Sequence, residues 1–403
     1  MVLAMDILFA SSKGSQYRYF KALVAKLPYR CSVTTLYPCL PSFKDFEQLT
    51  FALLKKGVAF HVARKKAKVG LKWLPDWVWW LYTVKAYVRF ALIYVSFHAY
   101  FRKNSVGYVG VWNGHRLPEM AIKLAARKLG VKTIYFENGL LPNTTVMDFT
   151  GVNDKGSLVR NPEFYRSYAR KHDHDSLNMH QIIPRIPHKN KMNQKLIERP
   201  KGVKYLFVPF QVGFDSQILI NSNWINSMQQ FYEVLEQVVN RIKDKDLVLV
   251  VKEHPSDPRG FKELHGRHPR IYFSNESTEE LIVDSEAVIT INSSVGLESL
   301  MLNKKVIVLG EACYKVPLMT QSASSAQELE AIINGINDWQ CDSLALKGYL
   351  SYLSGEYLLK GAWQNQINDP SQEHIISFIK KMRANLENAP QTTVSSERQL
   401  LAS

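Results

Sequence analysis

Leu247–Val251 (LVLVV) and Ala287–Ile291 (AVITI) decide the fold of this 403-residue chain. Both segments are rich in β-branched residues, contain no charged residue and are bounded by polar turn residues. Such runs are typical of strands that are buried on both faces of a parallel sheet. The sequence therefore predicts an α/β fold, in which ligands bind beyond the carboxyl ends of the strands.

The residues that follow these two strands suit an anion, most simply a phosphate. After the first strand, Lys252 adds a point charge, and His254 can donate to a phosphate oxygen or protonate a leaving group. After the second, Ser293 and Ser294 can cap a helix whose first turn offers N–H groups and the positive end of its dipole. Each motif alone also fits an ordinary cap or loop histidine, but their placement on successive strand ends favours a binding site.

Two sets of alternating strands and helices divide the chain. The first set has predicted strands at 6–10, 31–37, 106–112 and 132–136, with helices at 16–25 and 118–129. The second has strands at 205–210, 247–251, 287–291 and 305–309, with helices at 227–242 and 326–337. We therefore expect a GT-B-like pair of Rossmann-like αβα domains facing a central cleft. The expected boundaries are 1–180 for the first domain, 181–204 for a linker, 205–388 for the second domain with C-terminal helices, and 389–403 for a flexible tail.

Residues 140–156 are rich in Asn, Thr, Asp and Gly and indicate a long irregular segment. Irregular segments of that length in a compact domain are often functional.

The net charge of +15 calls for an anionic partner, and a nucleic acid, a membrane surface or an anionic substrate would each fit. Residues 55–72 contain seven basic residues and no acidic one. Residues 73–100 follow with ten aromatic side chains, but Asp76, Lys85 and Arg89 interrupt them and argue against a transmembrane helix. An amphipathic helix is expected, and both burial inside the domain and peripheral contact with an anionic membrane stay open. No nucleic-acid-binding module is recognisable, so nucleic acid is not an expected partner.

The amino terminus and the cysteines indicate the compartment. The first residues lead directly into a strand, without the basic and long apolar regions of a signal peptide. The four cysteines show no metal-ligand spacing and suggest a reduced environment. We expect a cytoplasmic protein, placed at the inner face of the inner membrane if the basic segment contacts lipid.

Further polar residues follow other predicted strands and would face the cleft. Glu137 with Gly139, and Asn113 with Arg116, come from the first domain, whereas Gln211 and Asp215 come from the second. Carboxylates from opposite walls, Glu137 and Asp215, allow acid–base or covalent chemistry at a sugar carbon. A single carboxylate in a loop is as often a solvated side chain or a helix cap.

At these residues the chain resembles known glycosyltransferases. Glu137-Asn-Gly139, Lys252-Glu-His-Pro255 and Ser293-Ser294 resemble motifs of the bacterial sialyltransferases that use CMP-sugars. Together with residues 211–215 (QVGFD) and 292–298 (NSSVGLE), the set is more similar to the capsule polysaccharide biosynthesis family, which includes retaining β-Kdo transferases. The resemblance extends over residues 6–312.

This resemblance implies a glycosyltransferase for bacterial surface polysaccharide synthesis, O-antigen or capsule, with the acceptor on the first domain and the cytidine nucleotide on the second. The donor would be CMP-β-Kdo, and the partner a polysaccharide or glycolipid acceptor. Asp215 would be the nucleophile of a double displacement, and Glu137 the acid–base group. The expected phosphate-binding residues are Lys252, His254, Ser293 and Ser294. Glu298 could bind the ribose and Arg116 the Kdo carboxylate, while the other expected substrate-binding residues are Asn113, Gly139, Gln211 and Asn292.

No metal or other cofactor is expected, because a monophosphate leaving group can be stabilised by Lys, His and helix N–H groups, and there is no Asp-x-Asp motif. An inverting, sialyltransferase-like transferase with Glu137 as base stays open. A non-catalytic basic protein that binds membrane or RNA stays open as well. The end of the chain also suggests a module of a larger polysaccharide synthase.

Overall fold

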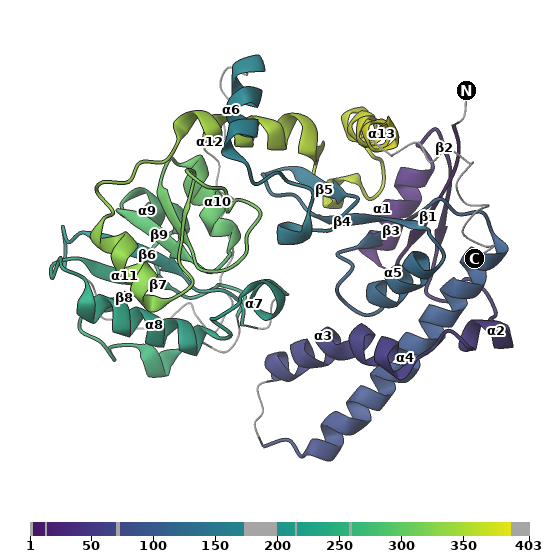
Figure 1. The fold of residues 1–403 in the computed structure, drawn as a ribbon, viewed down its shortest axis with the longest axis horizontal. Helices are drawn as coiled ribbons and strands as arrows, with labels where there is room; N and C mark the ends of the chain where they lie inside the picture. Colours follow the sequence, from purple (N-terminus) through teal and green to yellow (C-terminus); the bar gives the residue numbers. More distant parts are fainter. Residues whose placement is uncertain are drawn as a thin grey trace, which may run out of the picture.

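The computed structural model describes residues 3–12, 14–69, 73–172, 200–213, 216–257 and 260–387. The expected linker at 181–204 and tail at 389–403 therefore lie largely or wholly outside the described residues. Figure 1 shows two α/β units side by side, each built around its own sheet.

The first sheet combines parallel and antiparallel strands in the order β12-β5-β4-β3-β1-β2. Its strands are β1 (Leu3–Ala10), β2 (Tyr29–Thr34), β3 (Tyr108–Trp112), β4 (Lys132–Asn138), β5 (Thr144–Asp148) and β12 (Leu358–Lys360). The helices connected with it are α1 (Ser15–Val24), α2 (Phe43–Phe46), α3 (Phe51–Val69), α4 (Asp76–Lys103), α5 (Glu119–Lys128), α6 (Pro162–Lys171) and α13 (Gln372–Glu387), with short turns η1 (Asn153–Lys155) and η5 (Trp363–Gln366).

Successive side chains of β1 point to opposite faces of this sheet and pack into two different hydrophobic cores. Leu8 packs with the second half of α4 and with α5, whereas Phe9 packs with α1 and α13. Because successive strand residues point to opposite faces, this alternation explains why helices cover both sides.

The second sheet is entirely parallel, in the order β11-β10-β9-β6-β7-β8. Its strands are β6 (Tyr205–Pro209), β7 (Val248–Lys252), β8 (Ile271–Phe273), β9 (Ala287–Thr290), β10 (Lys305–Val308) and β11 (Gln321–Ser322). Its helices are α7 (Ser216–Asn221), α8 (Met228–Arg241), α9 (Thr278–Val283), α10 (Ser294–Met301), α11 (Ala326–Asn334) and α12 (Ser343–Tyr352), with η3 (Lys262–Leu264) and η4 (Leu353–Tyr357). The expected pair of Rossmann-like domains is confirmed. The expected burial of both faces of β7 and β9, the strands predicted at 247–251 and 287–291, is confirmed as well.

Two parts of the first domain differ from the sequence-based expectation. Residues 140–156 are not irregular throughout, because β5 forms an antiparallel hairpin with β4 inside them. The chain also returns to the first domain at its end, where β12 pairs with β5 and Phe378 of α13 packs against Phe9 and Phe136. Residues 205–388 therefore do not form one continuous domain.

A shared hydrophobic core joins the two domains. It contains Val146 of β5 and Tyr165 of α6 from one side, and Leu300 of α10, Val308 of β10 and Tyr349 of α12 from the other. Helices α6 and α12 lie against each other in Figure 1, and Tyr165 meets Tyr349 edge to face at 5.0 Å between ring centroids. This packing fixes one side of the contact between the domains.

Candidate active site between the domains

A cavity of about 730 Å³ lies between the domains and is lined by residues of both. That volume is within the usual range for small-ligand and cofactor sites. Ten of the twelve predicted site residues line it: Asn113, Arg116, Glu137, Gly139, Gln211, His254, Asn292, Ser293, Ser294 and Glu298. The remaining two are Asp215, which lies outside the described residues, and Lys252, which does not line the cavity.

The wall from the first domain is centred on Glu137 at the end of β4. Asn113, directly after β3, donates through Nδ2 to Glu137 Oε2 at 2.7 Å, and the backbone N–H of Asn138 donates to Glu137 Oε1 at 2.9 Å. Asn113 is only 6% exposed and has a φ of 61°, a conformation that asparagine adopts more readily than most residues. Two hydrogen bonds therefore hold the orientation of the Glu137 carboxylate at the cavity wall.

Gly139 allows the close approach that shapes the β4–β5 hairpin. A Cβ atom at this position would overlap both the side chain and the backbone carbonyl of Thr144. Thr144 belongs to β5, and the backbone of a paired strand cannot move aside locally. Glycine is therefore required at position 139 for the chain to pass this close to β5.

We expect Gly139→Ala to destabilise the protein by about 1–3 kcal/mol, because overpacking against backbone forces a shift of the strands. The same shift would displace Glu137, so any activity that depends on this carboxylate should fall more than stability alone explains. Urea unfolding and activity measured on one preparation check both effects. Gly335→Ala is the matched control, because its Cβ would have no neighbour closer than 3.6 Å. Equal effects of the two substitutions would contradict this account.

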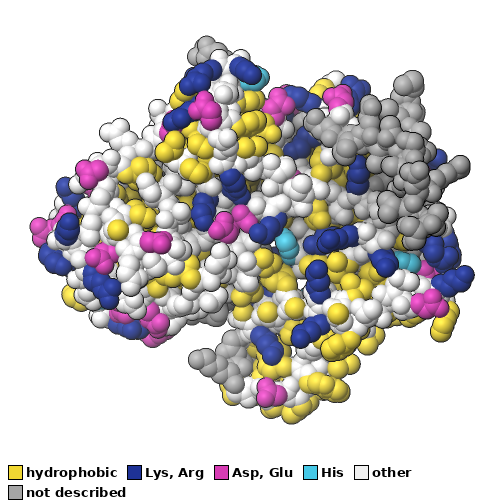
Figure 2. Space-filling model, in the orientation of Figure 1, with side chains coloured by type: hydrophobic (Ala, Val, Ile, Leu, Met, Phe, Trp, Pro, Cys, Tyr) yellow, Lys and Arg dark blue, Asp and Glu magenta, His cyan; other side chains and the backbone are white. Residues whose placement is uncertain are grey.

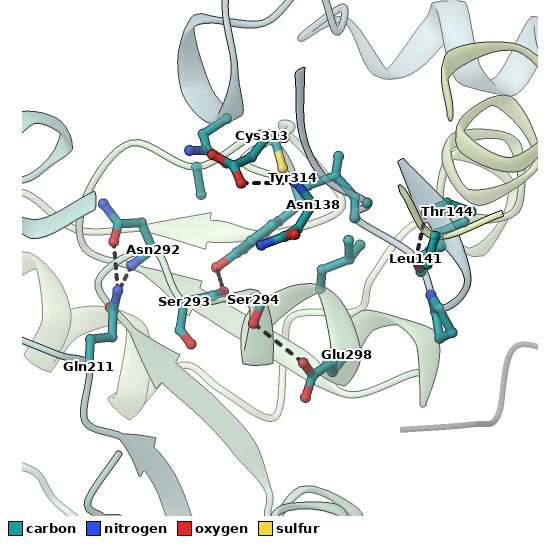
Figure 3. Close-up of a pocket in the computed structure, with 18 of the residues that line it drawn as sticks. Asn138, Leu141, Thr144, Gln211, Asn292, Ser293, Ser294, Glu298, Cys313 and Tyr314 are labelled. Atoms are coloured by element: carbon teal, nitrogen blue, oxygen red, sulfur yellow. Dashed lines mark hydrogen bonds between the residues drawn. The ribbon is translucent and has the colours of Figure 1, made fainter. Parts of the chain in front are cut away.

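The wall from the second domain lies where the strand order of its sheet reverses. The chain passes outward from β6 through β7 to β8 and then returns to β9 on the other side of β6, which creates a crevice between the loops after β6 and β9. Gln211 and Asn292 meet across it: Gln211 Nε2 donates to Asn292 Oδ1 at 2.9 Å, and the backbone N–H of Asn292 donates to Gln211 Oε1 at 3.1 Å. This reciprocal pair, visible in Figure 3, holds the two loops in register.

The loop after β9 leads directly into α10, whose N-terminus faces the cavity. Ser293 is the N-cap and accepts a hydrogen bond from the backbone N–H of Val295 at 3.2 Å, while Ser294 donates to Glu298 at 3.4 Å. Figure 3 shows Ser294 and Glu298 along one side of α10. The positive end of the helix dipole and two hydroxyl groups make this edge suitable for a phosphate oxygen.

His254 lies in the loop after β7 and is oriented by its own backbone. Its Nδ1 accepts a hydrogen bond from the N–H of Ser256 at 3.1 Å, so that a proton on a neutral ring resides on Nε2. Among the described residues that line the cavity, Arg116 and His254 are the ones that can carry a positive charge.

The side chain of Lys252 points away from the residues that line the cavity. Its ammonium group donates to the carbonyl of Glu276, beyond β8, and burial lowers its pKa from the ordinary lysine value. The residue two positions earlier, Val250, packs against α9, and strand alternation places Lys252 on that same face. The structure therefore does not bring Lys252 to the edge of the cavity formed by Ser293 and Ser294.

The sequence-based reading missed Tyr314, which forms part of the cavity wall. Its hydroxyl group donates to the backbone carbonyl of Ser293, and its ring packs so closely on Gly296 that no side chain would fit there. Burial raises the pKa of Tyr314 well above its ordinary value, so the phenol stays protonated and remains a donor. Nothing in the local sequence around Tyr314 indicates this contact, because it joins segments 21 residues apart.

Two further features of the wall come from the turn within the β4–β5 hairpin and from the segment that leads from β5 to α6. Asn143 and Asn153 line the cavity with positive φ angles, as Asn113 does. Arg160 donates to the carbonyls of Ala312 and Cys313, which also line the cavity, and to Asp154 at 3.1 Å. Arg160 thus fixes a loop of the second domain to the first.

The cavity combines an edge suited to an anion on one side with an oriented carboxylate on the other. Such an arrangement can hold a phosphorylated ligand on the second domain and move a proton to or from a hydroxyl group on the first. The fold and this cavity define an α/β protein with a candidate ligand site between two Rossmann-like domains.

Comparison with known proteins shows a family to which part of the chain is similar. Residues 166–332 match the family described as capsule polysaccharide biosynthesis protein. Through this region, which contains the whole second sheet, the chain is similar to the capsule polysaccharide biosynthesis family, as its motifs indicate. The Glu137 wall lies outside the matched region.

Individual relatives include protein FixF of Sinorhizobium fredii, which is 31% identical over 63% of this chain and 61% of FixF. The chain thus matches about three fifths of that relative. The capsule polysaccharide export protein KpsS of Escherichia coli is 24% identical over 57% of this chain and 72% of KpsS. Among solved structures, the β-Kdo 2,7 transferase of Thermosulfurimonas dismutans KpsC is 14% identical, with a TM-score of 0.45 over 90% of this chain and 97% of that one.

Proposed function

We propose that this protein is a glycosyltransferase that moves β-Kdo from CMP-β-Kdo to a polysaccharide or glycolipid acceptor at the cytoplasmic side of the inner membrane. The family match and the interdomain cavity support a glycosyltransferase role in capsule polysaccharide synthesis. One observation carries the proposal: the cavity sets an oriented carboxylate, Glu137, across from the N-terminus of α10 and His254.

The second domain would hold the donor. The phosphate of CMP would lie at Ser293 and Ser294, with His254 donating to the oxygen that becomes the leaving group. A single phosphate suits this edge, because Arg116 and His254 are the cationic side chains that the described part of the cavity lining provides. Glu298, one turn further along α10, would accept hydrogen bonds from the ribose hydroxyl groups.

The transfer would proceed in two displacements. In the first, the Asp215 carboxylate attacks the anomeric carbon of Kdo, the bond from that carbon to the phosphate oxygen breaks, and CMP leaves with the bonding electron pair. In the second, Glu137 takes the proton of the acceptor hydroxyl, whose oxygen attacks the same carbon and releases Asp215. Two inversions restore the β configuration.

A thermal-shift titration with CMP tests donor recognition. CMP should raise the melting temperature of the wild-type protein, because a ligand that binds only the folded state stabilises it. His254→Ala should reduce this rise. His268→Ala is the control, since His268 lies just before β8, at the amino ends of the strands, and bonds Asn240. The absence of any stabilisation by CMP would contradict the proposal and favour a protein without nucleotide-sugar chemistry.

A further inference from the structure

The helical hairpin formed by α3 and α4 extends away from the first domain. The second half of α4 is buried against the sheet, with Phe90, Tyr94 and Phe97 in its core. The first half packs against α3, and the hairpin projects at the lower edge of Figure 1.

The hairpin is held together along its inner side. The backbone of α3 approaches Phe90 so closely at Gly57 that a Cβ atom would overlap the ring. Further out, His61 stacks on Tyr82 and shares a hydrogen bond of 2.8 Å with it, and Lys66 lies over the ring of Trp79. The exposed side chains are therefore presented by a packed pair of helices.

The outer side of α4 presents an unbroken apolar stripe. Apart from the adjacent pair Trp80 and Leu81, its helical members follow one another at intervals of three or four residues. This spacing places them on one helix face, over about 22 Å from residue 77 to 92 at 1.5 Å per residue. Trp77 and Trp80 are 63% and 64% exposed, and Trp73, just before the helix, is 74% exposed. The complete stripe consists of Trp73, Trp77, Trp80, Leu81, Val84, Val88 and Leu92.

Basic residues surround this stripe. In residues 51–103, Asp76 is the one acidic residue against eleven Lys and Arg. Lys85 and Arg89 are exposed beside the stripe on α4, and α3 exposes Lys55, Lys56, Lys65, Lys66 and Lys68. Figure 2 shows yellow hydrophobic side chains with interspersed blue Lys and Arg over the hairpin at the lower edge of the molecule.

Among the described residues, no helix has both the length and the apolar character that crossing a membrane requires. The composition instead matches a helix that lies in a membrane interface, where tryptophan is favoured and lysine contacts anionic headgroups. A second copy of the chain is a less suitable partner for the stripe than a membrane, because two strongly basic hairpins would repel each other.

We propose that the α3–α4 hairpin docks on the surface of an anionic phospholipid bilayer, with the stripe residues inserted among the headgroups. Helix α3 contacts α7 of the second domain, and α4 contacts α5, which follows the Arg116 loop of the cavity. Docking therefore holds the interdomain cavity close to the lipid surface. This inference does not depend on the identity of the donor sugar.

Vesicle co-sedimentation tests the docking. The wild-type protein should bind vesicles of phosphatidylcholine with phosphatidylglycerol much more than vesicles of phosphatidylcholine alone, and added salt should weaken the binding. Trp77→Ser with Trp80→Ser should lower the partition coefficient about tenfold or more, because both side chains lose their interfacial contact. Lys65→Glu with Lys66→Glu should abolish the preference for phosphatidylglycerol.

Exposed control residues outside the hairpin separate docking from general effects of charge and apolarity. Leu318→Ser with Ile376→Ser replaces exposed apolar residues elsewhere, and Lys243→Glu with Lys262→Glu reverses exposed charges on the second domain. Both controls should bind as the wild type does. Brominated lipids should quench the tryptophan fluorescence of the wild type. They should quench that of the Trp77/Trp80 variant less.

Circular dichroism and the melting temperature establish that each variant is folded. Wild-type binding by the Trp77/Trp80 variant would overturn the proposal. So would a dimer of the wild type that this variant loses in size-exclusion chromatography, because a second copy would then cover the stripe. A failure of CMP to bind would leave these results unaffected, so the two proposals are tested separately.

Discussion

Glu137→Gln is expected to lower the turnover number for transfer by about two to four orders of magnitude, the usual contribution of a positioned acid–base group. Glutamine keeps the size of the side chain, and its amide oxygen can still accept from Asn113, which donates to Glu137 Oε2 at 2.7 Å in the structure. The substitution therefore removes the proton acceptor while the wall of the cavity remains in place.

Separate measurement of kcat and KM distinguishes this loss from a loss of donor binding. CMP release with glycan acceptors should show a large fall in kcat for Glu137→Gln, with the KM for CMP-β-Kdo little changed. Glu298→Gln is the matched control, because it removes a carboxylate of the same cavity on the donor side. It should act mainly on the KM for the donor. Near-normal turnover of Glu137→Gln would exclude Glu137 as the acid–base group.

Strand ends explain why so much of the cavity could be predicted. Glu137, Gln211, His254 and Asn292 were selected because each follows an apolar strand, and the structure brings all four to one cavity. In parallel sheets the carboxyl ends lie at one edge, so sequence position translates directly into spatial position. The family motifs add chemistry to that geometric rule.

Lys252 shows the limit of the rule. It also stands at a strand end, but it is still within β7 and on the face that packs against α9, so its ammonium group reaches Glu276 rather than the cavity. A shift of one position in a strand reverses the direction of a side chain. The last residue of a strand cannot be fixed from sequence to better than one or two positions, and Lys252 lies within that range of the end of β7.

Long-range packing was not predictable for a different reason. Tyr314 and Arg160 are positioned by backbone carbonyls of segments distant in sequence, at Ser293 and at Ala312 and Cys313. The return of α13 to the first domain depends on Phe378 meeting Phe9 and Phe136. Apolar periodicity predicts that a helix will pack, but it does not indicate which sheet the helix covers.

Asp215→Ala is expected to reduce transfer by about a thousandfold or more, because a double displacement cannot begin without its nucleophile. Asp215 lies outside the described residues, so this prediction rests on the QVGFD motif and on its neighbours Gln211 and Val212, which line the cavity. Asp215→Asn is the matched variant, because it keeps the side-chain size and removes the charge.

Intact-mass spectrometry separates the retaining from the inverting mechanism. In a double displacement, Glu137 acts on the acceptor in the second step, so Glu137→Gln incubated with CMP-β-Kdo should still accumulate a protein carrying one Kdo residue. Asp215→Ala and Asp215→Asn should carry none. An inverting enzyme with Glu137 as base would form no adduct in any of these proteins and would keep most of its activity in Asp215→Asn. Because the adduct and the turnover number respond to different residues, the pair of variants assigns nucleophile and base independently.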